Sequence, residues 1–269
     1  MPYKRYTETE LSAASLDQPA CESTPKKLVI CSSPRSGSFL LCRLLVNAGI
    51  GVPHEYFNFM HFDTIGRRFG IANTKQALQV RESVPGLMDR YIDILLRHRC
   101  QNGIFVAKVQ FWEYKWALVN PAGRRLLHDA AFLHLYRDDL LAQAISVRFA
   151  RLTGRWGFDD AVTTQPHPAP NFFDFAAIDE EIVKMANEDT GWRVFFAQHG
   201  ISPLPLSYEA LCRDQRGAVD QVARLLGLPA PPARLPRVTE REAYGPPVAG
   251  VPSRDEVAAA YIAHRRLAS

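Results

Sequence analysis

Short apolar runs alternate along this chain with segments in which apolar residues recur every three or four positions. The runs are rich in β-formers and predict buried strands, whereas the periodic segments predict amphipathic helices. The expected strands are 27–32, 104–109, 131–136 and, weakened by two prolines, 201–208. The expected helices are 39–48, 86–99, 140–152 and 217–227. Strands that alternate with helices predict an α/β fold of three layers, with a central parallel β-sheet flanked by helices.

Other stretches carry no such pattern. Residues 153–173 are rich in Gly, Pro and aromatic residues, and we expect a long surface loop or a substrate lid, because a helical pattern resumes at Ile178. Residues 229–253 are rich in proline and are expected to wrap over the surface. Residues 1–25 are polar and predict a flexible N-terminal tail or partner-binding arm, which leaves 26–269 as a single domain.

Composition limits the partners. The net charge is only +4 and no long run of Lys or Arg occurs, so no nucleic-acid partner is expected, while a small anion could still bind where a few cations converge. The five cysteines form no CxxC pair, which argues against a disulfide scaffold and a zinc site and fits a cytoplasmic location. No apolar stretch approaches the roughly 20 residues of a transmembrane segment.

The first candidate site is the tight polar turn between the first strand and the first helix. Its residues are Ser33, Pro34, Arg35, Ser36, Gly37 and Ser38. A strand that leads through such a turn into a helix can bind an anion, because the first helical amides are unsatisfied and the helix dipole favours negative charge. The lysine of the Walker A pattern is absent. A purely structural turn, capped by serines, remains the alternative.

The second candidate site begins where strand 131–136 ends. Arg137 follows this strand, and ligands of open α/β sheets bind beyond the carboxyl ends of the strands. Gln143 and Ser146 lie three positions apart on the next helix and share a face, so that Ser146 and Arg137 could hold a second phosphate. The alternative is a surface arginine that pairs with a neighbouring aspartate.

Taken together, these motifs resemble a known family. The segment SPRSGSFLL resembles the 5′-phosphosulfate loop of sulfotransferases that use PAPS (3′-phosphoadenosine-5′-phosphosulfate), and YRDDLLAQAIS resembles their 3′-phosphate motif. Further matches to the Stf0 group of this superfamily are GVPHEYFN (51–58), FVAKVQFW (105–112), TGWRVFF (190–196) and LSYEAL (206–211), and, more loosely, LPRVTEREAYG (235–245). The insert at 153–173 departs from the family pattern, which leaves the acceptor open.

The resemblance implies a P-loop-like sulfotransferase fold, PAPS as donor with PAP as product, and no metal. It also implies a carbohydrate or glycolipid acceptor, such as a trehalose-like sugar, and allows a homodimer. Cofactor contacts are then expected from the turn 34–38 and from Arg137, Gln143 and Ser146.

The same resemblance assigns the catalytic residues. Glu55 matches the general base of the group, and Arg35 is expected to hold the 5′-phosphosulfate and stabilise charge on the bridging oxygen. His54 is the neighbouring alternative base, and Lys108 could assist Arg35. Aromatic residues that could stack on a sugar ring are Trp112, Trp156, Trp192 and Phe172.

Two other classes of function compete with this one. An atypical P-loop-like kinase or NTPase would need a lysine in the first turn and an acidic magnesium ligand after a strand, and neither is clear. A non-catalytic nucleotide- or glycan-binding protein would not need a general base, and the presence of Glu55 argues against it.

Overall fold

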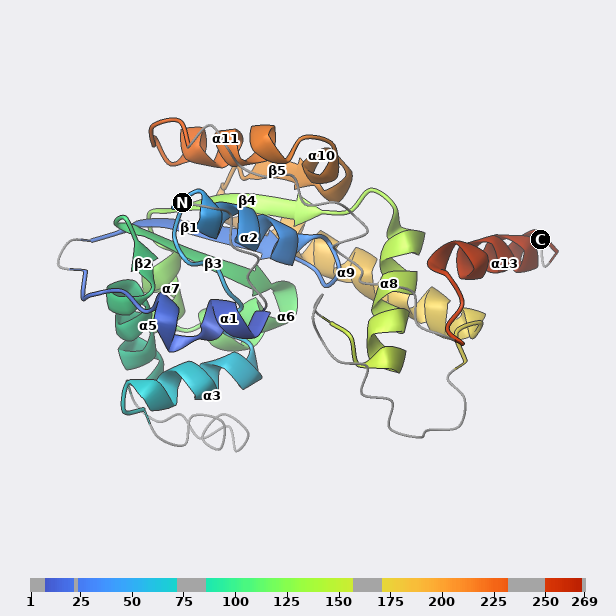
Figure 1. Cartoon of the computed structure of the whole chain (residues 1–269), viewed down its shortest axis with the longest axis horizontal. Coiled ribbons are helices and arrows are strands. Elements are labelled where there is room, and N and C mark those ends of the chain that lie inside the picture. Colours follow the sequence, from blue (N-terminus) through green and yellow to red (C-terminus); the bar gives the residue numbers. More distant parts are fainter. Residues whose placement is uncertain (1–7, 22–23, 72–85, 157–170, 232–249, 268–269) are drawn as a thin grey trace.

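The fold is built on a five-stranded sheet with the strand order β2-β3-β1-β4-β5 (Figure 1). The computed structural model describes residues 8–21, 24–71, 86–156, 171–231 and 250–267. The strands are β1 (Lys26–Ser32), β2 (Cys100–Gln101), β3 (Ile104–Gln110), β4 (Ala130–Tyr136) and β5 (Leu204–Ser207). β3, β1, β4 and β5 run parallel, and only the short edge strand β2 is antiparallel.

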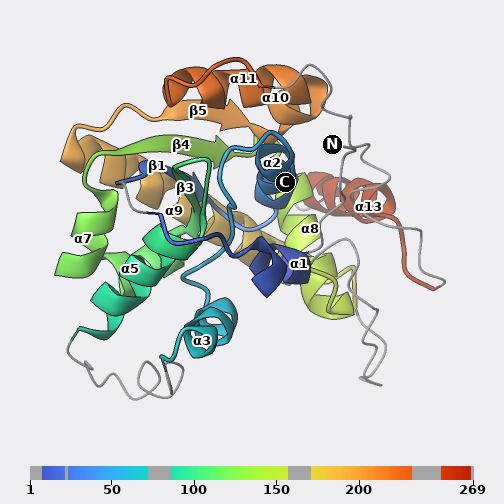
Figure 2. The same cartoon turned by 60° about the vertical axis from the view of Figure 1, so that its left-hand side comes forward.

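The strands are continuously apolar because helices cover both faces of the sheet. Side chains alternate along β1, so that Leu28 and Ile30 pack on one face while Val29 and Cys31 pack on the other. On the first face lie α2 (Ser38–Asn47) and α11 (Gln215–Leu225). A different set of helices covers the second face of the sheet (Figure 2).

The helices of the second face carry the larger aromatic core. They are α3 (Phe59–Arg68), α5 (Leu87–His98), the π-helical turn η2 (Tyr114–Leu118), α7 (Pro121–Leu127) and the last turns of α9 (Phe175–His199). Trp192 on α9 is fully buried, and its indole Nε1 donates a hydrogen bond to the carbonyl oxygen of Ser32 at 3.0 Å. This contact ties α9 to the carboxyl end of the central strand.

A third apolar cluster lies beyond the sheet. α8 (Leu140–Thr153), the first half of α9 and α13 (Arg254–Leu267) pack together at one end of the molecule, visible in Figures 1 and 2. α9 is 25 residues long and therefore reaches both the sheet and this cluster. Its length joins the two parts of the structure.

The expected α/β fold, with a central and mostly parallel sheet, is confirmed. The strands expected from the apolar runs are present, and the helices expected at 39–48, 86–99, 140–152 and 217–227 agree with α2, α5, α8 and α11 to within a few residues. Residues 157–170 of the expected lid and 232–249 of the proline-rich stretch lie outside the described residues. The division into one tail and one domain stays a prediction.

Part of the expected N-terminal tail packs against the domain. Residues 8–12 form α1 (Glu8–Ser12), and Leu11 is fully buried. Asp17 accepts hydrogen bonds from the guanidinium groups of Arg68 and Arg99, at 3.0 and 2.8 Å. A buried leucine and an ion-pair cluster therefore hold residues 8–21 in place, and the expectation of a flexible tail over 1–25 stays a prediction.

Candidate functional site

The candidate site lies where the parallel strands end. β1 ends at Ser32 and continues into the loop 33–37, which leads to α2. β3 ends at Gln110, and Cα pairing places Gln110 beside Ser32. β4 continues into Arg137, and β5 into Tyr208. One edge of the sheet therefore gathers both sequence motifs, as the carboxyl ends of parallel strands do in open α/β folds.

The loop after β1 has a constrained backbone. Gly37 has a φ of +82°, and a Cβ at this position would lie 2.4 Å from a ring carbon of Tyr208. Arg35 has a φ of +62°, a backbone angle that residues other than glycine seldom adopt. The Ser36 hydroxyl donates a hydrogen bond to the carbonyl oxygen of Ser33 at 2.9 Å. The first amide groups of α2, which have no partner within the helix, thus follow directly after a closely packed turn.

Residues of α8 fasten this loop. The Gln143 amide donates to the hydroxyl of Ser33 at 2.9 Å and to the carbonyl oxygen of Pro34 at 2.7 Å. Nε of Arg35 donates to the Ser146 hydroxyl at 2.9 Å. The structure thus brings the two predicted motifs together. It also shows that Gln143 holds the loop itself, and its expected contact with the cofactor stays a prediction.

Arg137 lies beside this loop in a position suited to an anion. Its guanidinium group covers the ring of Tyr208 at 4.6 Å from the centroid, and its Nε lies 3.7 Å from Oε1 of Glu209. Nε and Nη1 are nevertheless buried, with no hydrogen-bond partner among the residues that the structure describes. Buried guanidinium donors are costly to leave unpaired, so this geometry favours a ligand with anionic oxygen atoms.

Glu55 is a buried carboxylate with three donors. Lys108 Nζ lies 2.7 Å from its Oε1, the amide of Gln110 donates to the same oxygen at 2.5 Å, and the amide of Asn58 donates to Oε2 at 3.2 Å. Burial alone would raise the pKa of Glu55, but the Lys108 ammonium and these hydrogen bonds hold it below its usual value. Glu55 is therefore ionised near neutral pH.

His54 is held in a different way. It is buried, and its carbonyl oxygen accepts a hydrogen bond from the backbone N–H of Lys108 at 3.0 Å. Its ring lies 4.1 Å from the ring of His61. Burial lowers the pKa of His54 well below its usual value, and the neighbouring His61 and Lys108 lower it further. His54 is consequently neutral, and its backbone fixes the segment that carries Glu55 against β3.

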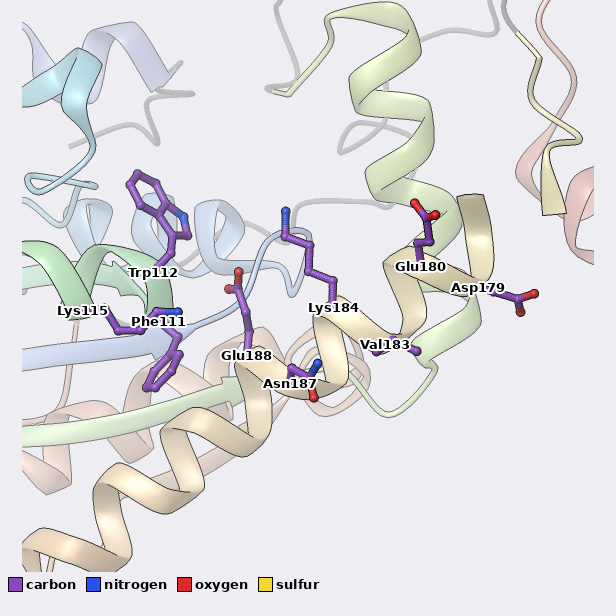
Figure 3. Close-up of a pocket in the computed structure, with 9 residues that line it drawn as sticks. All are labelled: Phe111, Trp112, Lys115, Asp179, Glu180, Val183, Lys184, Asn187 and Glu188. Carbon is purple, nitrogen blue, oxygen red and sulfur yellow. The ribbon is translucent and has the colours of Figure 1, made fainter. Parts of the chain in front are cut away.

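A pocket opens between α6 (Phe111–Glu113) and α9, and Figure 3 shows the side chains around it. Its volume is about 660 Å³. The lining residues are Phe111, Trp112, Lys115, Asp179, Glu180, Val183, Lys184, Asn187 and Glu188. The indole Nε1 of Trp112 donates to Oε1 of Gln110 at 2.6 Å, and Gln110 in turn binds Glu55. Hydrogen bonds therefore connect the wall of this pocket to the buried carboxylate.

Two further buried carboxyl groups lie near this pocket. Glu113 accepts a hydrogen bond from the backbone N–H of Gln110 at 2.9 Å through Oε2. Its Oε1 and the Oε2 of Glu188 are buried with no hydrogen-bond partner in the described part of the chain. Burial raises the pKa of Glu113 well above its usual value, with a further rise from the charge of Glu55. Burial raises the pKa of Glu188 to about 7.

The structure separates the four aromatic residues that were considered for sugar stacking. Trp192 and Phe172 are buried in apolar clusters, so neither ring is exposed at the surface. Trp156 is 44% exposed, and its carbonyl oxygen accepts a hydrogen bond from Arg35. Trp112 lines the pocket. Periodicity and composition could not separate these residues, because indole rings occur both in cores and at sugar sites.

Some residues of the site escaped the sequence reasoning. Gln110 is the last residue of β3, and Glu113 and Tyr208 follow the carboxyl ends of strands, so the rule that singled out Arg137 could also have found them. Glu188 lies midway along a long helix, and no sequence signal distinguishes it from the other acidic residues there.

Within the described ranges, no three His, Cys, Asp or Glu side chains gather closely enough to hold a metal ion. Among the helices that the structure describes, none has both the length and the apolar character needed to cross a membrane. The expectations of a metal-free reaction and of a cytoplasmic location stay predictions.

Comparison with known proteins identifies the family. The chain is 26% identical to the trehalose 2-sulfotransferase of Mycobacterium tuberculosis over 231 residues, which are 74% of this chain and 83% of the relative. It is 27% identical to the trehalose 2-sulfotransferase of Mycolicibacterium smegmatis over 258 residues, 81% of this chain and 90% of the relative. A solved sulfotransferase domain from the Synechococcus PCC 7002 olefin synthase is 18% identical, with a TM-score of 0.42 over 78% of this chain and 76% of that domain. The profile of the Stf0 sulphotransferase family matches residues 27–245, and this protein therefore belongs to that family of sulfotransferases.

Proposed function

We propose that this sulfotransferase moves the sulfuryl group of PAPS directly onto a carbohydrate hydroxyl, with Glu55 as general base. One observation carries the proposal most strongly. A buried and ionised carboxylate, Glu55, lies at the same sheet edge as the loop after β1 and the unpaired guanidinium nitrogen atoms of Arg137. A base and an anion site are the two elements that sulfuryl transfer needs.

The residues at this edge fit the donor. The start of α2 and the cation of Arg35 would receive the 5′-phosphosulfate, since helix N-termini bind such anions through their free amides. The two unpaired nitrogen atoms of Arg137 would receive the 3′-phosphate together with the Ser146 hydroxyl. PAPS, when bound, supplies a sulfuryl group attached to a good leaving group.

Glu55 is arranged to take a proton from the acceptor. Its Oε1 already accepts two hydrogen bonds, from Lys108 and Gln110, whereas within the described residues Oε2 accepts only the longer bond from Asn58. Oε2 therefore keeps a lone pair for the proton of an attacking hydroxyl. Lys108 keeps Glu55 ionised and so holds it in the form that acts as a base.

Calorimetry with PAP tests the donor site. We expect PAP to bind without magnesium, and ATP or GTP with magnesium to bind far more weakly. Arg137→Ala should weaken PAP binding by about 10–100-fold, because a charge-assisted hydrogen bond is lost. Binding of a magnesium nucleotide in place of PAP would favour a kinase-like activity instead. Unchanged PAP affinity in the variant would remove Arg137 from the donor site.

A second experiment tests the base. Glu55→Gln keeps the size of the side chain and one acceptor oxygen, but it replaces the other oxygen by an NH2 donor and removes the basic carboxylate. We expect turnover with labelled PAPS and a sugar acceptor to fall by about 100-fold or more, while PAP affinity stays within about twofold. Retained turnover would exclude Glu55 as the base, and the neutral His54 would become the candidate.

A further inference from the structure

The pocket between α6 and α9 has the chemistry of a sugar site. Phe111 and Trp112 provide aromatic surface on the α6 side. From α9, Lys184 and Glu188 extend toward the space beside Trp112 (Figure 3). An aromatic ring can cover the C–H face of a sugar, while charged and amide groups around it bind hydroxyls. The pocket volume of about 660 Å³ lies in the range of small-ligand sites.

The Glu188 carboxylate is the part of this pocket that lacks a partner. Its side chain is about nine-tenths buried, and Oε2 has no hydrogen bond within the part of the chain that the structure describes. No ammonium or guanidinium group pairs with it closely in the described residues, although Lys184 and Lys115 attract it from a distance. A buried carboxylate without donors is costly, and a ligand hydroxyl would supply one.

The pocket is also coupled to the proposed base. Trp112 binds Gln110, and Gln110 binds Glu55, through hydrogen bonds of 2.6 and 2.5 Å. A ring held against Trp112 would therefore lie next to residues that position the catalytic carboxylate. The Lys108–Glu55 pair and Gln110 all come from β3 or from the segment that pairs with it.

We propose that this pocket is the acceptor subsite, that it takes an uncharged sugar ring, and that Glu188 selects the acceptor by accepting hydrogen bonds from its hydroxyls. The inference rests on the proposed function and deepens it. Three acidic and two basic side chains line the pocket, so it offers an anionic acceptor no large excess of positive charge. A buried group with a pKa of about 7 can also lose or keep its proton to suit a hydroxyl partner.

The test is steady-state sulfation of trehalose, maltose and an amino sugar, with labelled PAPS. We expect wild-type enzyme to sulfate at least one neutral disaccharide. Glu188→Gln should raise the KM for this sugar by about 10–100-fold while kcat changes less and PAP affinity stays within about twofold. Trp112→Leu, which removes the stacking surface, should also raise the acceptor KM by about 10-fold. Asp220→Asn on α11 removes a partly exposed carboxylate, paired with Arg216, on the other face of the sheet and serves as a control, with no expected change.

The outcomes separate this inference from the proposed function. Unchanged acceptor KM in both pocket variants, with normal sulfation, would place the acceptor elsewhere and overturn the subsite alone. Sulfation of the amino sugar only would overturn the preference for an uncharged ring. PAP binding without sulfation of any sugar would overturn the carbohydrate acceptor and this pocket together. Failure to bind PAP would reject the donor site and hence the proposed function itself.

Discussion

Replacing Lys108 by methionine isolates the charge that keeps Glu55 ionised. The side chains of the two residues form an almost fully buried ion pair, with Nζ 2.7 Å from Oε1. At this distance, and with an effective dielectric constant of about 20, Coulomb's law gives roughly 6 kcal/mol of attraction. The burial of both charges opposes much of this attraction. Removing one partner leaves the other charge buried, which typically costs about 3–5 kcal/mol of stability.

The cost should depend on pH. In the wild type the folded-state pKa of Glu55 is lowered, so the pair contributes stability above the unfolded pKa and loses it as the pH falls through the folded pKa. In Lys108→Met the ammonium group that lowers the pKa of Glu55 is gone, so burial raises the folded-state pKa of this carboxyl group. The stability of the variant is then lost as the pH rises through that value. The difference in the free energy of unfolding between the wild type and Lys108→Met should therefore grow from acid to neutral pH.

Urea unfolding at several values between about pH 4 and about pH 8 measures this difference. We expect Lys108→Met to lose about 3–5 kcal/mol of unfolding free energy near neutral pH and clearly less at acid pH. Lys26→Met is the matched control, because Lys26 lies at the other end of β1, is exposed, and donates to the carbonyl oxygen of Leu226. A loss in Lys108→Met that does not vary with pH would refute the argument that Lys108 sets the ionisation of Glu55.

The same buried charges and constrained turns support further predictions. Asp17→Ala should lower the free energy of unfolding by about 3–5 kcal/mol, because the fully buried Arg99 loses the carboxylate that pairs with it. Asp93→Ala breaks an exposed ion pair with Arg125 and should lower it by less than about 1 kcal/mol. Chemical denaturation of both variants measures the two losses. Gly37→Ala should cost more than about 1 kcal/mol and also weaken PAP binding by calorimetry, since a Cβ there meets Tyr208 at a positive φ. Equal losses from both aspartate variants, or unchanged PAP affinity in Gly37→Ala, would contradict these expectations.

Sequence reasoning predicted those features that depend on local pattern. The apolar runs of β1, β3 and β4 stand out because both faces of the sheet are covered, and the turn after β1 stands out because its residues suit a helix start. Arg137 was found because strand ends converge in a parallel sheet. β5 was the least clear strand, since its prolines obscure the pattern at the sheet edge.

Long-range contacts could not be read from the sequence in the same way. Lys108 was considered as a helper of the donor site, but it pairs with Glu55 because a short bridge places His54 beside Ala107 on β3. Glu188 comes from a helix far along the chain, and its burial depends on how α9 crosses the end of the sheet. Such properties arise from tertiary packing, which periodicity does not encode.

The position of β1 explains why donor and acceptor would meet at this edge. β1 lies between β3 and β4, so the chain passes to one side of it for β3 and to the other side for β4. The residues proposed to hold the donor follow β1 and β4, whereas Gln110 and Trp112, proposed to serve the acceptor side, follow β3. In-line transfer needs the two substrates on opposite sides of the sulfur atom, and strands on opposite sides of β1 can present them in this way. Substitutions after β3 and on α9 should therefore change acceptor preference while the affinity for PAP stays constant, which is a separation that steady-state kinetics and calorimetry can measure together.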